Sequence, residues 1–193
     1  MIAAIIHAAG ESKRMGQPKM LLAWGEETVL EHVIGVVRSA GVDDIEVVTG
    51  AVQQEVEAIC HKQSARVVYN PAYAQTEMLG SLQAGLLALP GVTEAALVTL
   101  GDQPQIEVGT VREVLGEYHR SRAHLVVPSY QRRRGHPWLL GRVLWKEVLG
   151  LRAPDSPREF LNGHSEEIRY VEIDSPSILQ DLDTPDDYRD ARP

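Results

Sequence analysis

Cysteine is almost absent from this chain of 193 residues, which contains only Cys60. A single cysteine forms no intramolecular disulfide and supplies no cysteine-based zinc site. A reducing, cytoplasmic location is therefore expected. Aromatic residues make up only 5% of the sequence. The core must consequently be built mainly from valine, leucine, isoleucine and alanine.

Long hydrophobic runs are also missing, because no apolar stretch approaches the roughly 18 residues that a membrane-spanning helix needs. Residues 1–7 are apolar but lead straight into a polar, glycine-containing loop, which indicates a first strand rather than a signal peptide. The net charge of −8 argues against non-specific binding of nucleic acids. Neither a membrane nor a nucleic acid is expected as a partner.

Short β-rich runs alternate regularly with helical patterns along the chain. The pattern predicts strands at residues 2–7, 45–49, 66–69, 95–100, 125–128 and 168–173. It predicts helices at residues 28–39, 53–61, 79–89, 108–119 and 143–149, and a last helix after Thr184. Thr28 and Glu31 have the spacing of a capping box. This alternation predicts an α/β fold, a single three-layer Rossmann-like domain whose mostly parallel, twisted sheet carries helices on both faces.

Two polar motifs begin where predicted strands end, at Ala8 and at Gly101. Ligands of such sheets bind beyond the carboxyl ends of the strands. Both motifs are therefore expected at the same edge of the sheet.

The first motif, residues 8–19, reads Ala-Ala-Gly-Glu-Ser-Lys-Arg-Met-Gly-Gln-Pro-Lys. Gly10 and Gly16 allow the backbone to turn and to approach an anion closely. A hydroxyl donor and three cations complete the loop: Ser12, Lys13, Arg14 and Lys19. Neither Gly-x-x-x-x-Gly-Lys-Ser/Thr nor Gly-x-Gly-x-x-Gly is present. The loop indicates an anion site of another kind, and a solvated glycine turn is the alternative.

The second motif places Asp102 directly after a predicted strand, where a carboxylate holds Mg²⁺ or caps a turn. A third motif near the end of the chain contains four aspartates. Asp186 and Asp187 suit the first turn of a helix. Asp181 and Asp183 remain open between metal ligands and solvated charges.

Residues 7–22 resemble the signature of the nucleotidyltransferase superfamily that includes the molybdenum cofactor guanylyl- and cytidylyltransferases. The pair Ala8 and Ala9 favours the cytidylyltransferase branch, although His7 stands where that branch has leucine. The resemblance implies one nucleotidyltransferase domain over residues 1–193. Residues up to about 128 would bind the nucleotide, and residues from about 129 would bind the acceptor and complete the metal site.

The resemblance also implies roles for individual residues. Catalysis is expected of Lys19, Arg14 and Asp102. Nucleotide binding is expected of Ala8, Ala9, Gly10, Ser12, Arg14, Met15, Gly16, Lys19, Ser81 and Asp102. Asp102 and Asp183 are expected to hold Mg²⁺, with Asp181 as the alternative to Asp183.

Acceptor binding is expected of His136, Arg134 and Arg158, because residues 134–137 resemble the Arg-Gly-His-Pro segment of the cytidylyltransferases. A structural role for the histidine is the alternative. The sequence departs from the family pattern at Glu77, where glycine is usual, and at residues 155–158, where both small residues before Arg158 are changed. These departures leave the base contacts and the acceptor open.

The expected function is Mg²⁺-dependent transfer of a nucleoside monophosphate, with CTP as the favoured donor, to a phosphorylated pterin such as molybdopterin. A molybdoenzyme that receives the cofactor is a further candidate partner. A guanylyltransferase, or an enzyme acting on another small phosphorylated metabolite, is an alternative. A non-catalytic protein of the same fold that delivers a cofactor is an alternative of another class.

Overall fold

The computed structural model describes residues 1–193 except for the side chain of Glu77, so the departure noted at that position lies outside the described residues. The main sheet has the strand order β10-β7-β9-β6-β1-β4-β5, with β8 paired to β7. Its strands are β1 (Ile2–Ala8), β4 (Ile45–Thr49), β5 (Arg66–Tyr69), β6 (Ala95–Leu100), β7 (Leu125–Tyr130), β8 (Arg133–Arg134), β9 (Trp138–Gly141) and β10 (Arg169–Glu172).

Seven α-helices are assigned in the described chain: α1 (Val29–Ser39), α2 (Gln53–Lys62), α3 (Tyr73–Ala88), α4 (Val108–Ser121), α5 (Trp145–Gly150), α6 (Pro157–Gly163) and α7 (Pro185–Ala191). Short 3₁₀ turns occur at Lys19–Leu21, Arg142–Leu144 and Pro176–Leu179. The strands β2 (Ala23–Trp24) and β3 (Glu27–Thr28) form a small hairpin. The helices of the described residues are all too short or too polar to cross a membrane.

The sheet is mostly parallel, as the sequence predicts. Strand β1 runs parallel to both β4 and β6, and β10 runs parallel to β7. Strand β9 is antiparallel and lies between β6 and β7. The last third of the chain therefore completes the sheet on the far side of β6, away from β4.

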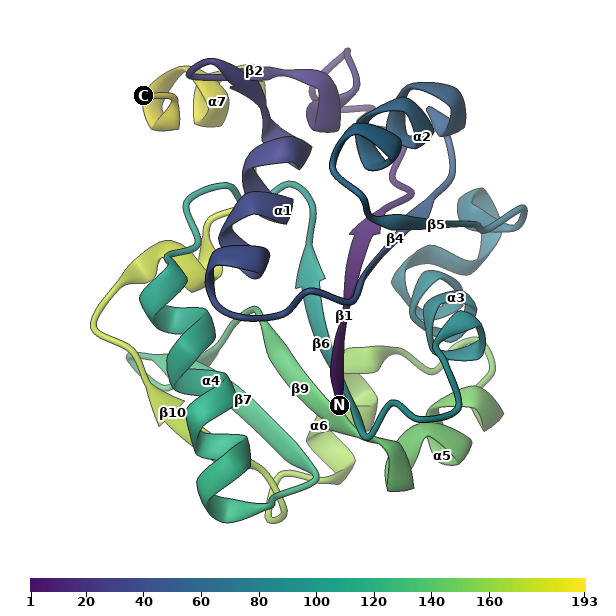
Figure 1. The fold of residues 1–193 in the computed structure, drawn as a ribbon, viewed down its shortest axis with the longest axis vertical. Helices are drawn as coiled ribbons and strands as arrows, with labels where there is room; N and C mark the ends of the chain where they lie inside the picture. The colour runs from purple at the N-terminus through teal and green to yellow at the C-terminus, as the bar shows by residue number, and fades with distance from the viewer.

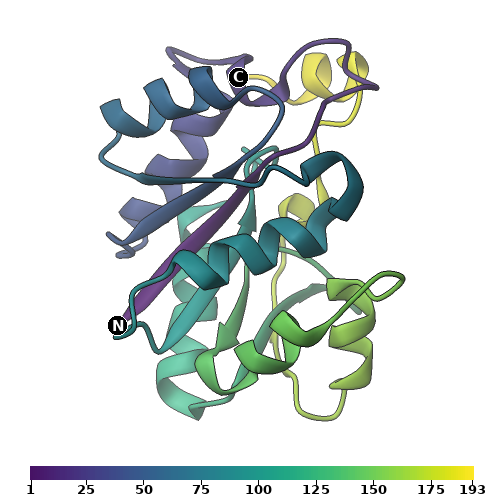
Figure 2. The same cartoon turned by 90° about the vertical axis from the view of Figure 1, so that its right-hand side faces the viewer.

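Helices cover both faces of the sheet, which confirms the predicted three layers (Figures 1 and 2). Alternate residues of β1 show the division. Ala4 and Ile6 belong to the apolar cluster formed with α1, α2 and α4. Ala3 and Ile5 belong to the cluster formed with α3, α5 and α6. The period of two along the strand thus decides which helix each side chain meets.

Two helices differ from the prediction. Helix α3 begins at Tyr73, six residues before the predicted start, because the Asn70 carboxamide accepts a hydrogen bond from the Ala72 amide (3.0 Å) and forms the turn before it. Helix α6 was not predicted at all. Its signals are nevertheless in the sequence, since Ser156 caps the helix and Pro157 is its first residue. The capping box of Thr28 and Glu31 is confirmed.

Backbone contacts bring the three polar motifs together. The Gly101 amide donates to the His7 carbonyl (2.9 Å) at the ends of β1 and β6, and the Leu182 amide donates to the Asp102 carbonyl (3.0 Å). A side chain at Gly101 would come within 2.9 Å of the His7 carbonyl oxygen, so this close approach requires glycine. The segment before α7 is therefore fixed against the end of β6.

An apolar cluster anchors the C-terminal segment to the first loop. Leu182 is fully buried and packs with Met15, Leu22 and Val29. The Tyr188 hydroxyl donates to the Ala23 carbonyl (2.6 Å), and Figure 1 shows α7 beside β2 at the same end of the molecule. Residues separated by more than 160 positions thus share one site.

Candidate active site

The Lys19 ammonium group lies at the centre of the three motifs. Its Nζ donates to Asp102 Oδ2 at 3.0 Å and to Asp183 Oδ1 at 2.7 Å. Lys19 is only 8% exposed. Burial alone would lower the pKa of Lys19, but the charges and hydrogen bonds of the two carboxylates outweigh burial and raise it. Lys19 therefore stays charged at neutral pH, where it holds together carboxylates from two different loops.

The first loop folds around the Ser12 backbone and side chain. The Ser12 carbonyl accepts hydrogen bonds from the amides of Met15 (3.0 Å) and Gly16 (3.1 Å), and the Ser12 hydroxyl accepts one from the Lys19 amide (3.1 Å). Ser12 has φ +52° and Gly16 has φ +74°, so the backbone is left-handed at both turns. This conformation brings Lys19 back toward the end of β1.

The other two cations of the loop differ in position. Arg14 Nη2 contacts Asp183 Oδ2 at 2.8 Å, and most of the Arg14 side chain is exposed. Lys13 pairs with Glu11 (2.7 Å) at the surface. Met15 packs in the apolar cluster with Leu182, so only its backbone is available for an anion. The positive charge near the carboxylates of Asp102 and Asp183 therefore comes from Lys19 and Arg14.

A smaller cavity of about 290 Å³ lies between the first loop and the start of α3. It contains most of the residues expected at a nucleotide. Its lining residues include His7, Ala9, Gly10, Ser12, Lys19, Tyr73, Met78, Ser81 and Asp102. Ser81 is buried, and its hydroxyl accepts a hydrogen bond from the Asn70 carboxamide (3.2 Å). The cavity thus has charged groups from the loop motifs and neutral polar groups from α3.

A larger cavity of about 1160 Å³ shares Met78, Leu100 and Asp181 with the smaller one. Four arginines line it together with two aromatic side chains: Arg132, Arg133, Arg134, Arg158, Trp138 and Tyr170. In a chain of net charge −8, this is a local concentration of positive charge. It suits a ligand that combines a ring system with an anionic group.

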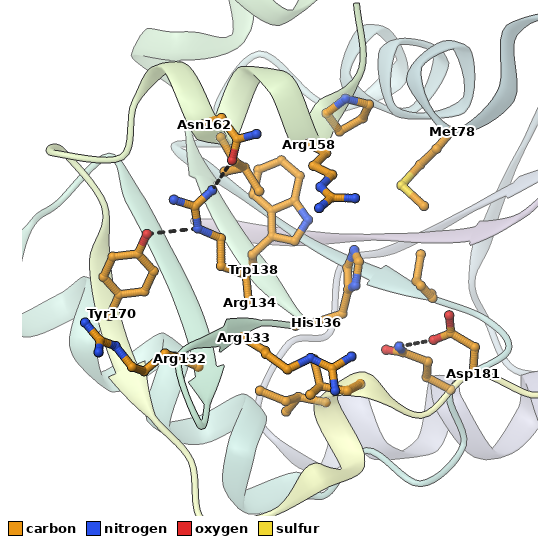
Figure 3. A pocket seen from close by; sticks show the side chains of 18 of the residues that line it. Met78, Arg132, Arg133, Arg134, His136, Trp138, Arg158, Asn162, Tyr170 and Asp181 are labelled. Carbon is orange, nitrogen blue, oxygen red and sulfur yellow. Dashed lines mark hydrogen bonds between the residues drawn. The ribbon is translucent and has the colours of Figure 1, made fainter.

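The three residues expected at the acceptor all line the larger cavity. Arg134 donates to the Tyr170 hydroxyl (2.9 Å) and to the Asn162 carboxamide oxygen (2.8 Å). Figure 3 shows this group apart from Asp181, with His136 drawn between them. Desolvation lowers the pKa of His136 to about 3, and the nearby His7 adds to the shift. His136 is therefore neutral at physiological pH.

The residues changed relative to the family pattern have a local structural role. Ser156 accepts a hydrogen bond from the Glu159 amide (3.2 Å), and Pro157 occupies the first position of α6. Arg158 follows directly and lines the larger cavity. Ser156 and Pro157 therefore begin the helix whose second residue, Arg158, lines the cavity.

The sequence did not decide between Asp181 and Asp183 as the second metal ligand, and the two residues make different contacts in the structure. Asp183 contacts Lys19 and Arg14, whereas Asp181 accepts a hydrogen bond from the Gln103 carboxamide. Burial, followed by the charges of Asp102 and Asp183, raises the pKa of Asp181, and the Gln103 hydrogen bond opposes that rise. Asp186 and Asp187 lie in the first turn of α7, where Asp187 completes a capping box with Thr184.

Several cavity residues were not among the predicted site residues. Arg132 and Arg133 were not predicted as site residues, but both line the larger cavity where β7 turns into β8. His7, Tyr73, Met78 and Gln103 line one cavity or the other. The sequence indicates a position for His7 only through the alternation of side chains along β1. His7 lies two residues after Ile5 and four after Ala3, so its side chain is on the face of the sheet that packs against α3.

Comparison with known proteins identifies the family of the chain. Residues 4–168 match the family described as the MobA-like NTP transferase domain. The chain belongs to this family. It is a nucleotidyltransferase, as the sequence predicts.

Three relatives extend this MobA-like assignment to nearly the whole chain. The chain is 31% identical to the molybdenum cofactor cytidylyltransferase of Escherichia coli, over 99% of this chain and 95% of that protein. The crystal structure of Rv0371c from Mycobacterium tuberculosis is similar with a TM-score of 0.85 and 28% identity, over 98% of this chain and 96% of that one. The same protein is also known in complex with manganese (TM-score 0.81). The structure of a nucleotidyl transferase from Methanothermobacter is similar with a TM-score of 0.83 and 27% identity, over 100% of this chain and 96% of that one.

Proposed function

We propose that this MobA-like nucleotidyltransferase transfers CMP from CTP to the phosphate of a molybdopterin-type acceptor and releases pyrophosphate. The observation that carries the proposal is the cluster of Lys19, Asp102 and Asp183 at the smaller cavity, which Lys19 and Asp102 line. That cavity adjoins the larger one through the shared residues Met78, Leu100 and Asp181. The identity of 31% to a molybdenum cofactor cytidylyltransferase favours CTP and the pterin. Residues 1–128 would then bind the nucleotide, and residues 129–193 would bind the acceptor. A cytoplasmic location is part of the same proposal.

In the proposed reaction an oxygen of the acceptor phosphate attacks the α-phosphorus of CTP, and the bond from the α-phosphorus to the bridging oxygen breaks. Both electrons of that bond leave with pyrophosphate. The acceptor phosphate is already a nucleophile, so catalysis requires positioning and charge neutralisation rather than a strong base. Lys19 and Arg14 would neutralise the triphosphate and the departing pyrophosphate.

The chemistry of the site suits a divalent cation. Two carboxylates, Asp102 and Asp183, come from two loops and lie on either side of the Lys19 ammonium group, which contacts both. Oxygen donors of this kind suit Mg²⁺ and Mn²⁺, and Mg²⁺ usually keeps several waters and phosphate oxygens as further ligands. Among the described residues no three His, Cys, Asp or Glu side chains form a metal site. The protein would therefore supply two ligands, and the cation would neutralise charge on the α-phosphate.

The four arginines of the larger cavity would hold the acceptor. Arg134 is already oriented by Tyr170 and Asn162, so its guanidinium is fixed before a ligand arrives. Arg158 and the arginines of the β7–β8 turn would contact the acceptor phosphate. Tyr170, whose side chain is exposed, would provide an aromatic wall for the pterin.

A donor screen tests the proposal. Pyrophosphate release is measured with ATP, CTP, GTP and UTP, each with Mg²⁺ and with or without molybdopterin. We expect the highest kcat/KM with CTP and release that depends on the acceptor. A preference for GTP would make the protein a guanylyltransferase. Molybdopterin binding without pyrophosphate release from any of the four would favour the non-catalytic delivery protein.

A further inference from the structure

His7 is a polar residue of the smaller cavity that has no role in the reaction described above. It is the seventh residue of the chain and lies near the carboxyl end of β1, two residues after Ile5 on the same face of the sheet. That face packs against α3, where Ser81 and Met78 line the same cavity. His7 therefore lies opposite the neutral groups that α3 supplies.

The imidazole of His7 has a buried nitrogen that lacks a hydrogen-bond partner in the described part of the chain. The residue is only 9% exposed, and its Nε2 has no partner among the described residues. Leaving a buried polar group unpaired is unfavourable, whereas an apolar side chain of similar size would avoid that cost. The backbone of His7 makes its sheet hydrogen bonds whatever the side chain is. The fold thus gives no reason for an imidazole here.

A phosphate gains less from this imidazole than from the cations of the site. The cationic groups of the site come from Lys19 and Arg14 on the first loop, and Lys19 is the one that lines this cavity. Burial lowers the pKa of His7 to about 4, so the ring is neutral at physiological pH and offers a triphosphate no charge. A neutral imidazole instead offers one N–H donor and one nitrogen acceptor. Either nitrogen can form one hydrogen bond with an acceptor or a donor on the edge of a nucleobase.

We infer that the side chain of His7 makes a hydrogen bond to the base of the nucleoside triphosphate and contributes to the choice of donor nucleotide. This inference rests on the proposed function of the smaller cavity as the nucleotide site. The two histidines line different cavities, His7 the smaller and His136 the larger. In this inference His7 contacts the donor nucleotide, whereas His136 lies beside the acceptor. His7 is a specificity-determining residue and takes no part in the transfer step.

The test is a binding titration with Mg²⁺ and without acceptor. The ligands are the triphosphate that the wild-type protein binds best, with CTP expected, and inorganic tripolyphosphate, which has no base. For His7→Leu we expect the affinity for the nucleotide to fall about tenfold, the upper range for one neutral hydrogen bond. The affinity for tripolyphosphate should stay within about twofold of wild type, well below the tenfold step that one hydrogen bond represents.

Two further variants sharpen the test. His7→Gln keeps a nitrogen donor and should recover most of the nucleotide affinity. His61→Leu, at an exposed position of α2, should change neither affinity. The melting temperature of ligand-free His7→Leu should equal or exceed that of the wild type, because the unpaired nitrogen is removed.

Three results would overturn the inference. The first is unchanged nucleotide affinity in His7→Leu. The second is an equal loss of affinity for the nucleotide and tripolyphosphate, which indicates a structural role. The third is failure of the variant to fold. Failure of the proposed function is a different result, namely wild-type protein that binds no nucleoside triphosphate more tightly than tripolyphosphate.

Discussion

Replacing Lys19 by alanine is expected to lower the rate of pyrophosphate release by about 100- to 1,000-fold, the loss that follows removal of one preorganised electrostatic group from an active site. Lys19 is the one cation that contacts both Asp102 and Asp183 through its ammonium group. Without it, the triphosphate loses a charge partner and the two carboxylates repel each other. The measurement is steady-state kcat and KM for the nucleotide.

The matched control is Lys13→Ala. Lys13 belongs to the same loop but pairs with Glu11 at the surface, so its rate should stay near wild type. The fold of Lys19→Ala is expected to survive, because both aspartates keep partial contact with water, with side-chain exposures of 20% and 31%. The melting temperature checks this. A folded Lys19→Ala protein with near-normal pyrophosphate release would contradict the assignment of Lys19.

Replacing Asp102 by asparagine is expected to remove Mg²⁺-dependent activity, with a loss of at least about 100-fold at low Mg²⁺. The amide keeps the shape of the carboxylate but loses the charge that a hard cation requires. The loss should be partly offset at high Mg²⁺ concentration, which would appear as a raised apparent KM for the metal. The measurement is the rate of pyrophosphate release across a Mg²⁺ titration.

Asp186→Asn is the matched control for Asp102. Asp186 lies in the first turn of α7 and pairs with Arg189 at the surface, so its Mg²⁺ dependence should equal that of the wild type. Asp183→Asn should behave like Asp102→Asn if both residues hold the cation. Wild-type rates for Asp102→Asn at low Mg²⁺ would show that Asp102 is not a ligand.

The architecture was largely predictable from the sequence because its signals are local. The alternation of strand and helix patterns predicts the three layers, and the capping box at Thr28 predicts the start of α1. The two motifs were also expected at one edge of the sheet, and the structure places them there on the neighbouring strands β1 and β6. Helix α3 was misplaced because a side chain, Asn70, forms the turn that starts it.

The site was only partly predictable, because its completion depends on contacts between distant residues. The pattern of aspartates did not show whether Asp181 or Asp183 contacts the catalytic lysine. The hydrogen bond between the Leu182 amide and the Asp102 carbonyl fixes this segment so that Asp183 reaches Lys19. Arg132 and Arg133 belong to a run of three consecutive arginines whose sequence alone does not indicate a cavity. They become cavity residues because Gly135 and His136 fix that turn against Pro128 and Ile178 through backbone hydrogen bonds.

The central claim is that the acceptor attacks the α-phosphorus of CTP at the Lys19 site. Transfer of label from CTP to molybdopterin tests it most directly, with the radioactive phosphorus placed either at the α- or at the γ-position. The account predicts that the α-label appears in the acceptor and that the γ-label leaves in pyrophosphate. Appearance of the γ-label in the acceptor, or of neither label while CTP and molybdopterin are both bound, would contradict it.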